Sequence, residues 1–293
     1  MTAFAGIDAA DIRTFAQLVV VGLSTGAAYA LVGIGMVLIY RTTNIVNFAQ
    51  GAFAVLGGLL MVSLEDDLHG AVAAVVSVLV VALVGAAMGF IAVGLRGRTT
   101  PLASLVITLG LALIASSADL LAFGDRPHTY APISERAWSV SGVVVQPQYA
   151  LVVGVTLLSA LLLTLLLRRT IVGHALVACS DSVRAAELVG INVRSVAVIA
   201  FAVSAAISAL GTLLLTPVLP VSYDSDVGIA VNGFAAAAFG GLASIRLALI
   251  GGLVLGIAEQ LVVVYWDAQY ELAIALVVML VLIGWRSRHE AVE

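Results

Sequence analysis

The sequence RRTIVGHALVACSDSVRAAELVGINVR, residues 168–194, is the longest polar segment well inside an otherwise apolar chain. Apolar runs flank it at residues 149–167 and 195–216, and it carries four arginines against Asp181 and Glu187. An arginine-rich loop between two apolar runs is typical of the cytoplasmic face of a membrane protein. The segment therefore predicts a cytoplasmic loop in a polytopic membrane protein.

A short helix is expected inside this loop. Ser180 or Asp181 can cap its start, residues 182–189 form its body, and Gly190 supplies a left-handed stop. A helix of about two turns is not stable alone. We therefore expect it to dock against its own membrane domain or against another protein.

The composition of the whole chain is that of an all-α polytopic membrane protein. Of 293 residues, 62% are apolar and 10% are charged, and the mean hydropathy is +1.17, whereas soluble domains have about 25% charged residues. One span takes roughly 20 residues, so about eight to ten transmembrane helices are expected, some of them short or broken by glycine. They form a single domain over residues 1–293, with no room for a soluble catalytic domain.

The arginines divide the predicted loops into two groups. Nine apolar runs are expected, at residues 15–40, 44–63, 71–95, 102–123, 149–167, 195–216, 228–242, 247–266 and 270–285. If successive loops lie on opposite sides of the membrane, one side carries ten arginines. The other side carries three, Arg13, Arg126 and Arg136. The positive-inside rule makes the larger group cytoplasmic. It predicts an external N-terminus, a long external loop at residues 124–147 and a cytoplasmic C-terminus.

The residue types argue against several classes of protein. All 13 basic residues are arginine, so the chain has no P-loop lysine, and any ATP that drives it must be bound by another chain. The single Cys179 cannot form an intrachain disulfide, and the four histidines show no metal-ligand spacing. Catalytic constellations and basic patches for nucleic acid are absent from the sequence. We expect a transporter with no catalytic residue, metal or cofactor of its own.

Polar side chains within the apolar runs are candidates for a solute path. Asn44, Asn47 and Gln50 cluster where a helix begins, and they either cap that helix or offer amide groups to a polar solute. Glu259 lies within a late run, where an ionised group usually faces a cavity or a partner. Both a structural hydrogen bond and a place on the solute path fit Glu259.

Two of the runs are short and interrupted by glycine. They contain Asn47 and Asn232 and close on Gly-Gly-Leu at residues 57–59 and 240–242. Paired interrupted segments often mark inverted repeats around the substrate path of a transporter. Glycine also lets helices pack closely. Both interpretations remain open, and Asn232 joins the candidates for the path.

Several stretches resemble the membrane permeases of branched-chain amino-acid ABC importers, the LivH-type family. The matching stretches are residues 22–31, 44–51, 108–110, 173–192, 234–241 and 251–259. The most specific is RAAELVGIN, residues 184–192, which follows an Ala-Cys pair. The chain departs from the family pattern at Gln50, where histidine is common, and at Asn232, where lysine is frequent.

The resemblance implies an ABC-importer permease fold in the plasma (inner) membrane. It implies a second related permease, two ATPase subunits that bind ATP and Mg, and an extracytoplasmic binding protein as partners. The implied solute is Leu, Ile or Val, while relatives take urea, short amides or other amino acids.

A coupling contact with an ATPase subunit is expected in the loop, with the solute path elsewhere. The coupling residues are Ser180, Asp181, Val183, Arg184, Ala185, Ala186, Glu187, Leu188, Val189 and Gly190, and the path residues are Asn44, Asn47, Gln50, Asn232 and Glu259. A secondary, ion-coupled carrier and a membrane-embedded enzyme or scaffold are the alternative interpretations.

Overall fold

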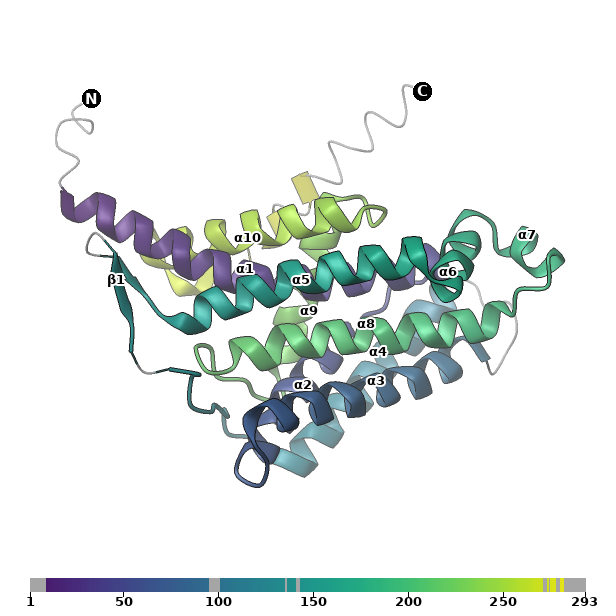
Figure 1. Ribbon diagram of the computed structural model, residues 1–293, viewed down its shortest axis with the longest axis horizontal. Coiled ribbons are helices and arrows are strands. Elements are labelled where there is room, and N and C mark those ends of the chain that lie inside the picture. Colours follow the sequence, from purple (N-terminus) through teal and green to yellow (C-terminus); the bar gives the residue numbers. More distant parts are fainter. Residues whose placement is uncertain are drawn as a thin grey trace.

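The protein is a bundle of long apolar helices (Figure 1). The computed structural model describes residues 9–94, 101–134, 136–140, 143–270, 273, 275–277 and 280–281. In these ranges, six helices are long and apolar enough to cross a membrane. They are α1 (Ala9–Thr43), α3 (Gly70–Gly94), α4 (Pro101–Phe123), α5 (Pro147–Arg169), α8 (Val193–Leu215) and α10 (Ile245–Tyr265). The predicted all-α polytopic membrane protein is thereby confirmed.

Shorter elements complete the bundle. They are α2 (Gln50–Glu65), α6 (Ile171–Asp181), α7 (Val183–Leu188), α9 (Ser225–Phe239) and the 3-10 turn η1 (Ala268–Tyr270). At about 1.5 Å per residue, α2 and α9 are shorter than the roughly 30 Å of hydrocarbon that a span crosses. Two of the nine predicted apolar runs, residues 44–63 and 228–242, form these helices, in agreement with the expectation that some helices are short or broken by glycine. The ninth run, residues 270–285, lies mainly outside the described residues.

The described loops separate to two opposite ends of the bundle (Figure 1). One end carries an antiparallel hairpin, β1 (Trp138–Val140) and β2 (Val143–Val145). The side-chain amide of Gln17 in α1 exchanges two hydrogen bonds of 2.8 Å with the backbone of Val144. The other end carries α6 and α7. These are the two groups that the charge pattern predicts, although four of the arginines counted there, Arg96, Arg98, Arg286 and Arg288, lie outside the described residues.

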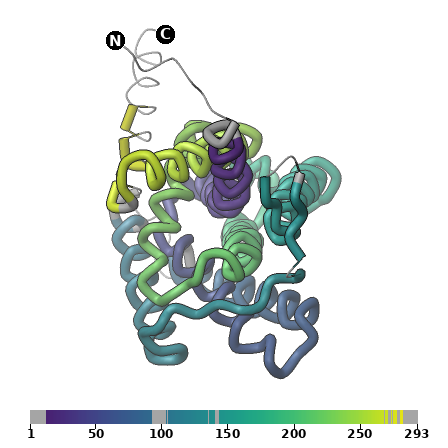
Figure 2. The backbone as a smooth tube through the Cα atoms, turned by 90° about the vertical axis from the view of Figure 1, so that its left-hand side faces the viewer, coloured from purple at the N-terminus to yellow at the C-terminus, as the bar shows by residue number. Residues whose placement is uncertain are grey.

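Helices α1 and α10 run beside one another (Figure 2), and glycines lie at their contact. Gly22 and Gly26 lie one turn apart on α1, and Gly252 and Gly256 lie one turn apart on α10. A Cβ on Gly26 would lie 2.5 Å from the carbonyl oxygen of Gly252, and a Cβ on Gly256 would lie 2.3 Å from the amide nitrogen of Gly26. Lipid provides no hydrophobic force between helices, so close backbone contact supplies van der Waals attraction instead.

The glycines of the two Gly-Gly-Leu segments have different positions. Gly57 lies inside α2, where a Cβ would come within 2.5 Å of Ala209 on α8. Gly240 and Gly241 instead follow the end of α9, and Gly241 has a φ of 59°. Close packing therefore accounts for the first segment and helix termination for the second.

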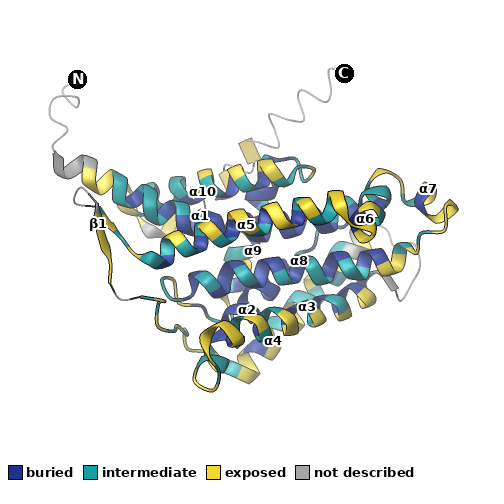
Figure 3. Cartoon of the chain, viewed as in Figure 1, coloured by how far each residue is buried: buried dark blue, intermediate teal, exposed yellow. Residues whose placement is uncertain are grey.

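Exposed residues lie on the outward faces of several long helices (Figure 3), and many of them are large and apolar. Leu83 on α3, Leu113 on α4 and Leu158 on α5 are all exposed, whereas α1 is mostly buried. Large exposed apolar surfaces mark contact with a membrane or with another protein. The burial pattern is that of a multi-pass membrane protein with α1 near its centre.

We expect Gly256→Ala to lower thermal stability. The added methyl group meets backbone atoms of α1, which cannot rotate away, so the cost lies near the upper end of the ~1–3 kcal/mol typical of overpacking. The matched control is Gly154→Ala on α5, where a Cβ meets no atom within 4 Å. The measurement is the temperature at which the detergent-purified chain loses its monodisperse elution. Equal midpoints for the two variants would contradict the close α1–α10 contact.

Candidate solute cavity and coupling segment

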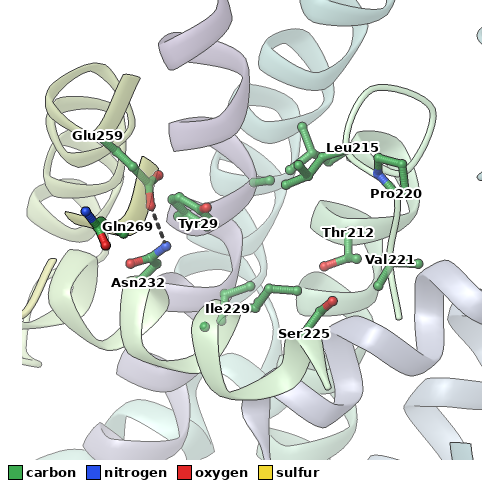
Figure 4. A pocket seen from close by; sticks show the side chains of 14 residues that line it. Tyr29, Thr212, Leu215, Pro220, Val221, Ser225, Ile229, Asn232, Glu259 and Gln269 are labelled. Atoms are coloured by element: carbon green, nitrogen blue, oxygen red, sulfur yellow. Dashed lines mark hydrogen bonds between the residues drawn. The ribbon is translucent and has the colours of Figure 1, made fainter. Parts of the chain in front are cut away.

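A cavity of about 360 Å³ is lined by residues of α1, α8, α9, α10 and η1 (Figure 4). Its apolar lining is Ala28, Val32, Leu215, Leu219, Pro220, Val221 and Ile229, and its polar side chains are those of Tyr29, Thr212, Ser225, Asn232, Glu259 and Gln269. Backbone hydrogen bonds join Val221 to His128 in the loop after α4, at the hairpin end of the bundle. The cavity therefore extends to the end that the charge pattern predicts to be external.

Two buried side chains form a polar pair in the cavity lining. Asn232 on α9 donates a hydrogen bond of 2.9 Å from Nδ2 to Oε1 of Glu259 on α10 (Figure 4). Asn232 is 3% exposed and Glu259 1%. Among the described residues, Oδ1 of Asn232 has no hydrogen-bond partner. Leaving a buried acceptor unsatisfied costs about 1–3 kcal/mol, so this oxygen calls for a hydrogen-bond donor that the described residues do not supply.

Helical spacing brings these two residues together. Gly252, Gly256 and Glu259 lie on one face of α10, at positions i, i+4 and i+7. The glycine contact with α1 thus directs Glu259 into the interior. Ser225 and Asn232 are also seven residues apart, on the face of α9 that lines the cavity. The packing of α10 on α1 therefore positions the polar pair.

Asn47 and Gln50 belong to a second polar cluster, which does not line the cavity. Nδ2 of Asn47 donates to Oε1 of Gln50 at 3.2 Å. Nε2 of Gln50 donates to the backbone oxygen and hydroxyl of Ser204, at 3.1 and 2.7 Å, and to the hydroxyl of Ser208. Gln50 is buried, as are both serines. The cluster ties α2 to α8, so these amides have partners within the protein.

Asn44 lies apart from both polar groups. It follows the end of α1 with a left-handed φ of 54°, and its side chain is exposed. The N-cap of α2 is Ala49, which makes no side-chain capping bond. Asn47 Oδ1 instead accepts from the amide of Ala49 at 3.1 Å. Of the two alternatives for this group, capping is therefore not the role of Asn44, and the turn before α2 is held by Asn47.

The predicted short helix is present as α7, but the residue that caps its start is not the predicted Ser180 or Asp181. Ser182 has an extended backbone, with φ of -160°, and its hydroxyl accepts from the amide of Ala185 at 3.2 Å. Ser180 and Asp181 instead end α6. The sequence alone does not show that a second helix fills residues 171–181. The predicted cap of the short helix therefore lies too early in the chain. Gly190, with φ of 86°, confirms the predicted left-handed stop.

Helix α7 docks on its own domain and also presents an outward face. Ala186 is buried in a cluster with Cys179 of α6 and Val196 of α8. Leu188 and Val189 are 83% and 76% exposed. Burial, followed by the charge of Glu187, raises the pKa of the Cys179 thiol, so this thiol stays protonated and poorly nucleophilic near neutral pH. The docked face is structural, which leaves the exposed pair available to a partner.

The sequence reading missed a buried acidic pair. Asp119 on α4 is 3% exposed. It lies within electrostatic range of Asp226, whose Oδ2 accepts a hydrogen bond from the hydroxyl of Ser116. Asp226 lies in the first turn of α9, which begins before the apolar run predicted at residues 228–242. A helix-start signal at Asp224 could have located it, whereas the contact with α4 has no local signature.

The chain is similar to proteins of a known family. The profile of the family described as "Branched-chain amino acid transport system / permease component" matches residues 18–283. The high-affinity branched-chain amino acid transport system permease protein LivH of Escherichia coli (strain K12) is 28% identical, over 92% of this chain and 93% of its own. The corresponding protein BraD of Pseudomonas aeruginosa is 28% identical, over 94% and 95%. A probable LivH of Methanocaldococcus jannaschii is 29% identical, over 80% and 77%.

We expect Glu259→Gln and Glu259→Leu to differ in stability. Glutamine keeps a side-chain oxygen that can accept from Nδ2 of Asn232, whereas leucine leaves that buried donor unsatisfied at a cost of about 1–3 kcal/mol. Thermal melting of the two purified variants, beside the parent chain, measures the difference. A glutamine variant as unstable as the leucine variant would show that the hydrogen bond is not what Glu259 contributes.

Proposed function

The chain belongs to the family of branched-chain amino acid transport permeases, and we propose that it is the membrane-spanning subunit of an ATP-driven importer. The solute that we propose is a branched-chain amino acid, Leu, Ile or Val. The relatives in Escherichia coli and Pseudomonas aeruginosa are named for transport of such amino acids. The observation that carries the proposal to this chain is the cavity at Asn232 and Glu259, because it combines apolar walls with buried hydrogen-bond acceptors.

The cavity matches an amino acid of this kind in two respects. An ammonium group is a hydrogen-bond donor, and the unsatisfied Oδ1 of Asn232 is a buried acceptor. A branched aliphatic side chain fits against walls such as Val32, Leu215 and Ile229. Asn232 and Glu259 therefore remain on the proposed path. Asn47 and Gln50 support the packing of α2 instead, and Asn44 lies outside the cavity.

The proposed partners follow from the absence of lysine in this sequence and from the two opposite ends of the helix bundle. With no lysine in the sequence, a P-loop must reside in other chains, so ATP and Mg are assigned to two ATPase subunits and no cofactor to this chain. A second related permease completes the membrane part. In this proposal an extracytoplasmic binding protein delivers solute to the hairpin end, the N-terminus is external and the C-terminus is cytoplasmic.

A continuous set of contacts supports coupling through α7. Its exposed Leu188 and Val189 are suited to a groove on an ATPase subunit, while Ala186 fixes α7 to α6. A guanidinium nitrogen of Arg41 in α1 donates to the hydroxyl of Ser180 in α6 at 3.3 Å. Because α1 also packs on α10, a rigid displacement of α7 reaches the helix that bears Glu259. In this proposal the loop couples ATP hydrolysis to opening of the cavity.

A short amide or urea is the second candidate for the solute. Its N–H groups can donate to the same acceptor, Oδ1 of Asn232. The apolar walls favour the branched side chain. Competition of unlabelled urea or acetamide against labelled leucine distinguishes the two solutes, since only a shared site gives competition.

We expect Glu187→Ala with Val189→Ala to uncouple the reconstituted importer. The parent complex should take up labelled leucine only with ATP and binding protein. Removing the outward side chains of α7 should lower uptake about tenfold or more, which corresponds to ~1.4 kcal/mol of lost coupling. The stimulation of ATP hydrolysis by the binding protein should fall together with uptake. Initial rates in proteoliposomes provide both measurements.

The matched control is Asp67→Ala with Val72→Ala, which removes an acid and a valine at the α2–α3 turn. Both side chains are exposed and distant from α7. Membrane insertion and recovery of both ATPase subunits must be equal in all variants. Unchanged uptake by the α7 variant would sink the coupling assignment. Uptake by the chain alone under an ion gradient would replace the importer with a secondary carrier.

A further inference from the structure

Three arginines converge on one groove at the end of the bundle that carries α6. Arg41 comes from the end of α1, Arg168 from the end of α5 and Arg246 from the start of α10. They line a volume of about 350 Å³ together with Thr164 and Ser244. The positive-inside rule explains why the arginines share a side of the membrane. It does not explain why three helices bring them to a single groove.

The electrostatics of this arginine groove call for an anion. Arg41 and Arg168 lie in last turns, where the helix dipole favours a positive charge. Arg246 lies in the first turn of α10, where the dipole opposes one. The hydroxyl of Ser244 accepts from the amide of Leu247. The amides before Leu247 have no acceptor within the helix, as at the start of any α-helix.

The groove offers no counter-charge of its own in the part of the chain that the structure describes. None of its lining residues is acidic. The side-chain bond that Arg41 makes is to the neutral hydroxyl of Ser180. Guanidinium groups bind phosphate oxygens through paired N–H donors. A phosphate group placed between the three arginines would meet both these donors and the positive end of α10.

Exposed apolar side chains extend from the groove along two neighbouring helices. On α5, Leu161 and Leu157 lie seven and eleven residues before Arg168, on the same helical face. On α10, Ile250 and Val254 follow Arg246 at i+4 and i+8. Helices α5 and α10 contact one another. A phosphate at the arginines would therefore have acyl-chain binding surface directly beside it.

We propose that the arginine groove binds a phosphate-bearing anion, supplied by the membrane as the headgroup of an acidic phospholipid. The bound lipid bridges the ends of α1 and α5 to the start of α10. It therefore stabilises the contacts beneath α6, from which α7 projects. This site is separate from the solute cavity and does not depend on the identity of the solute.

The test compares Arg168→Gln and Arg246→Gln with Arg169→Gln. Arg169 is adjacent to Arg168 and exposed, but it does not line the groove, so this control removes the same charge. The full transporter complex is reconstituted in phosphatidylcholine vesicles with a minor fraction of phosphatidylglycerol and then extracted gently. Native mass spectrometry counts the retained lipids. Each groove variant should retain about fivefold less phosphatidylglycerol, as expected for one basic residue at a membrane surface, and the control should match the parent.

A second arm replaces phosphatidylglycerol by inorganic phosphate in phosphatidylcholine vesicles. Only complexes with all subunits and monodisperse elution are compared, and two groove variants guard against one that fails to assemble. Equal phosphatidylglycerol retention in all three variants would overturn the site. Equal retention of phosphatidylcholine and phosphatidylglycerol by the parent would overturn the anion preference. A third outcome is that inorganic phosphate stabilises the parent against heat, that this effect is lost in both groove variants, and that no lipid is retained selectively. That outcome would overturn the lipid headgroup as the source of the bound phosphate.

Discussion

The contact between α1 and α10 at Gly26 and Gly256 is the interaction on which the rest of the bundle depends. Lipid is as apolar as the side chains of these helices, so their association must come from close contact and internal hydrogen bonds. Two pairs of glycines, spaced one turn apart, bring the backbones together. The same face of α10 then points Glu259 at Asn232, and the cavity lies beside that pair.

Two of the interior polar sites, at Gln50 and at Asn232, differ in whether the protein satisfies their hydrogen bonds. Gln50 donates to Ser204 and Ser208 and holds the short α2 against α8. Asn232 retains a buried acceptor without a hydrogen-bond partner among the described residues. A satisfied polar cluster specifies packing, whereas an unsatisfied acceptor on a cavity wall can receive a ligand. This difference, more than the residue types, favours Asn232 over Gln50 as a solute contact.

Much of the fold followed from local chemistry. Hydropathy indicates helices long enough to span a membrane, and the arginines distinguish the two ends of the bundle. Gly190 ends α7 because glycine readily adopts the left-handed backbone conformation found there. The failures concern contacts between distant segments. Ser182 caps α7 because another helix already occupies residues 171–181, and Asp119 is buried because α9 begins beside it. Hydropathy also does not show that residues 44–63 and 228–242 yield helices shorter than the hydrocarbon thickness of a membrane. Only the packed bundle shows which of the polar residues reach the cavity.

The most direct test of the account is thiol accessibility from the hairpin side, in a Cys179→Ala background. Ser225→Cys places a thiol in the cavity lining, and Ser204→Cys places one in the satisfied cluster around Gln50. A membrane-impermeant maleimide applied outside should label the first position, block leucine uptake and be slowed by leucine with its binding protein. The second position should stay unlabelled. Labelling of Ser204→Cys with leucine protection, and none at Ser225→Cys, would contradict a solute path through the Asn232–Glu259 cavity.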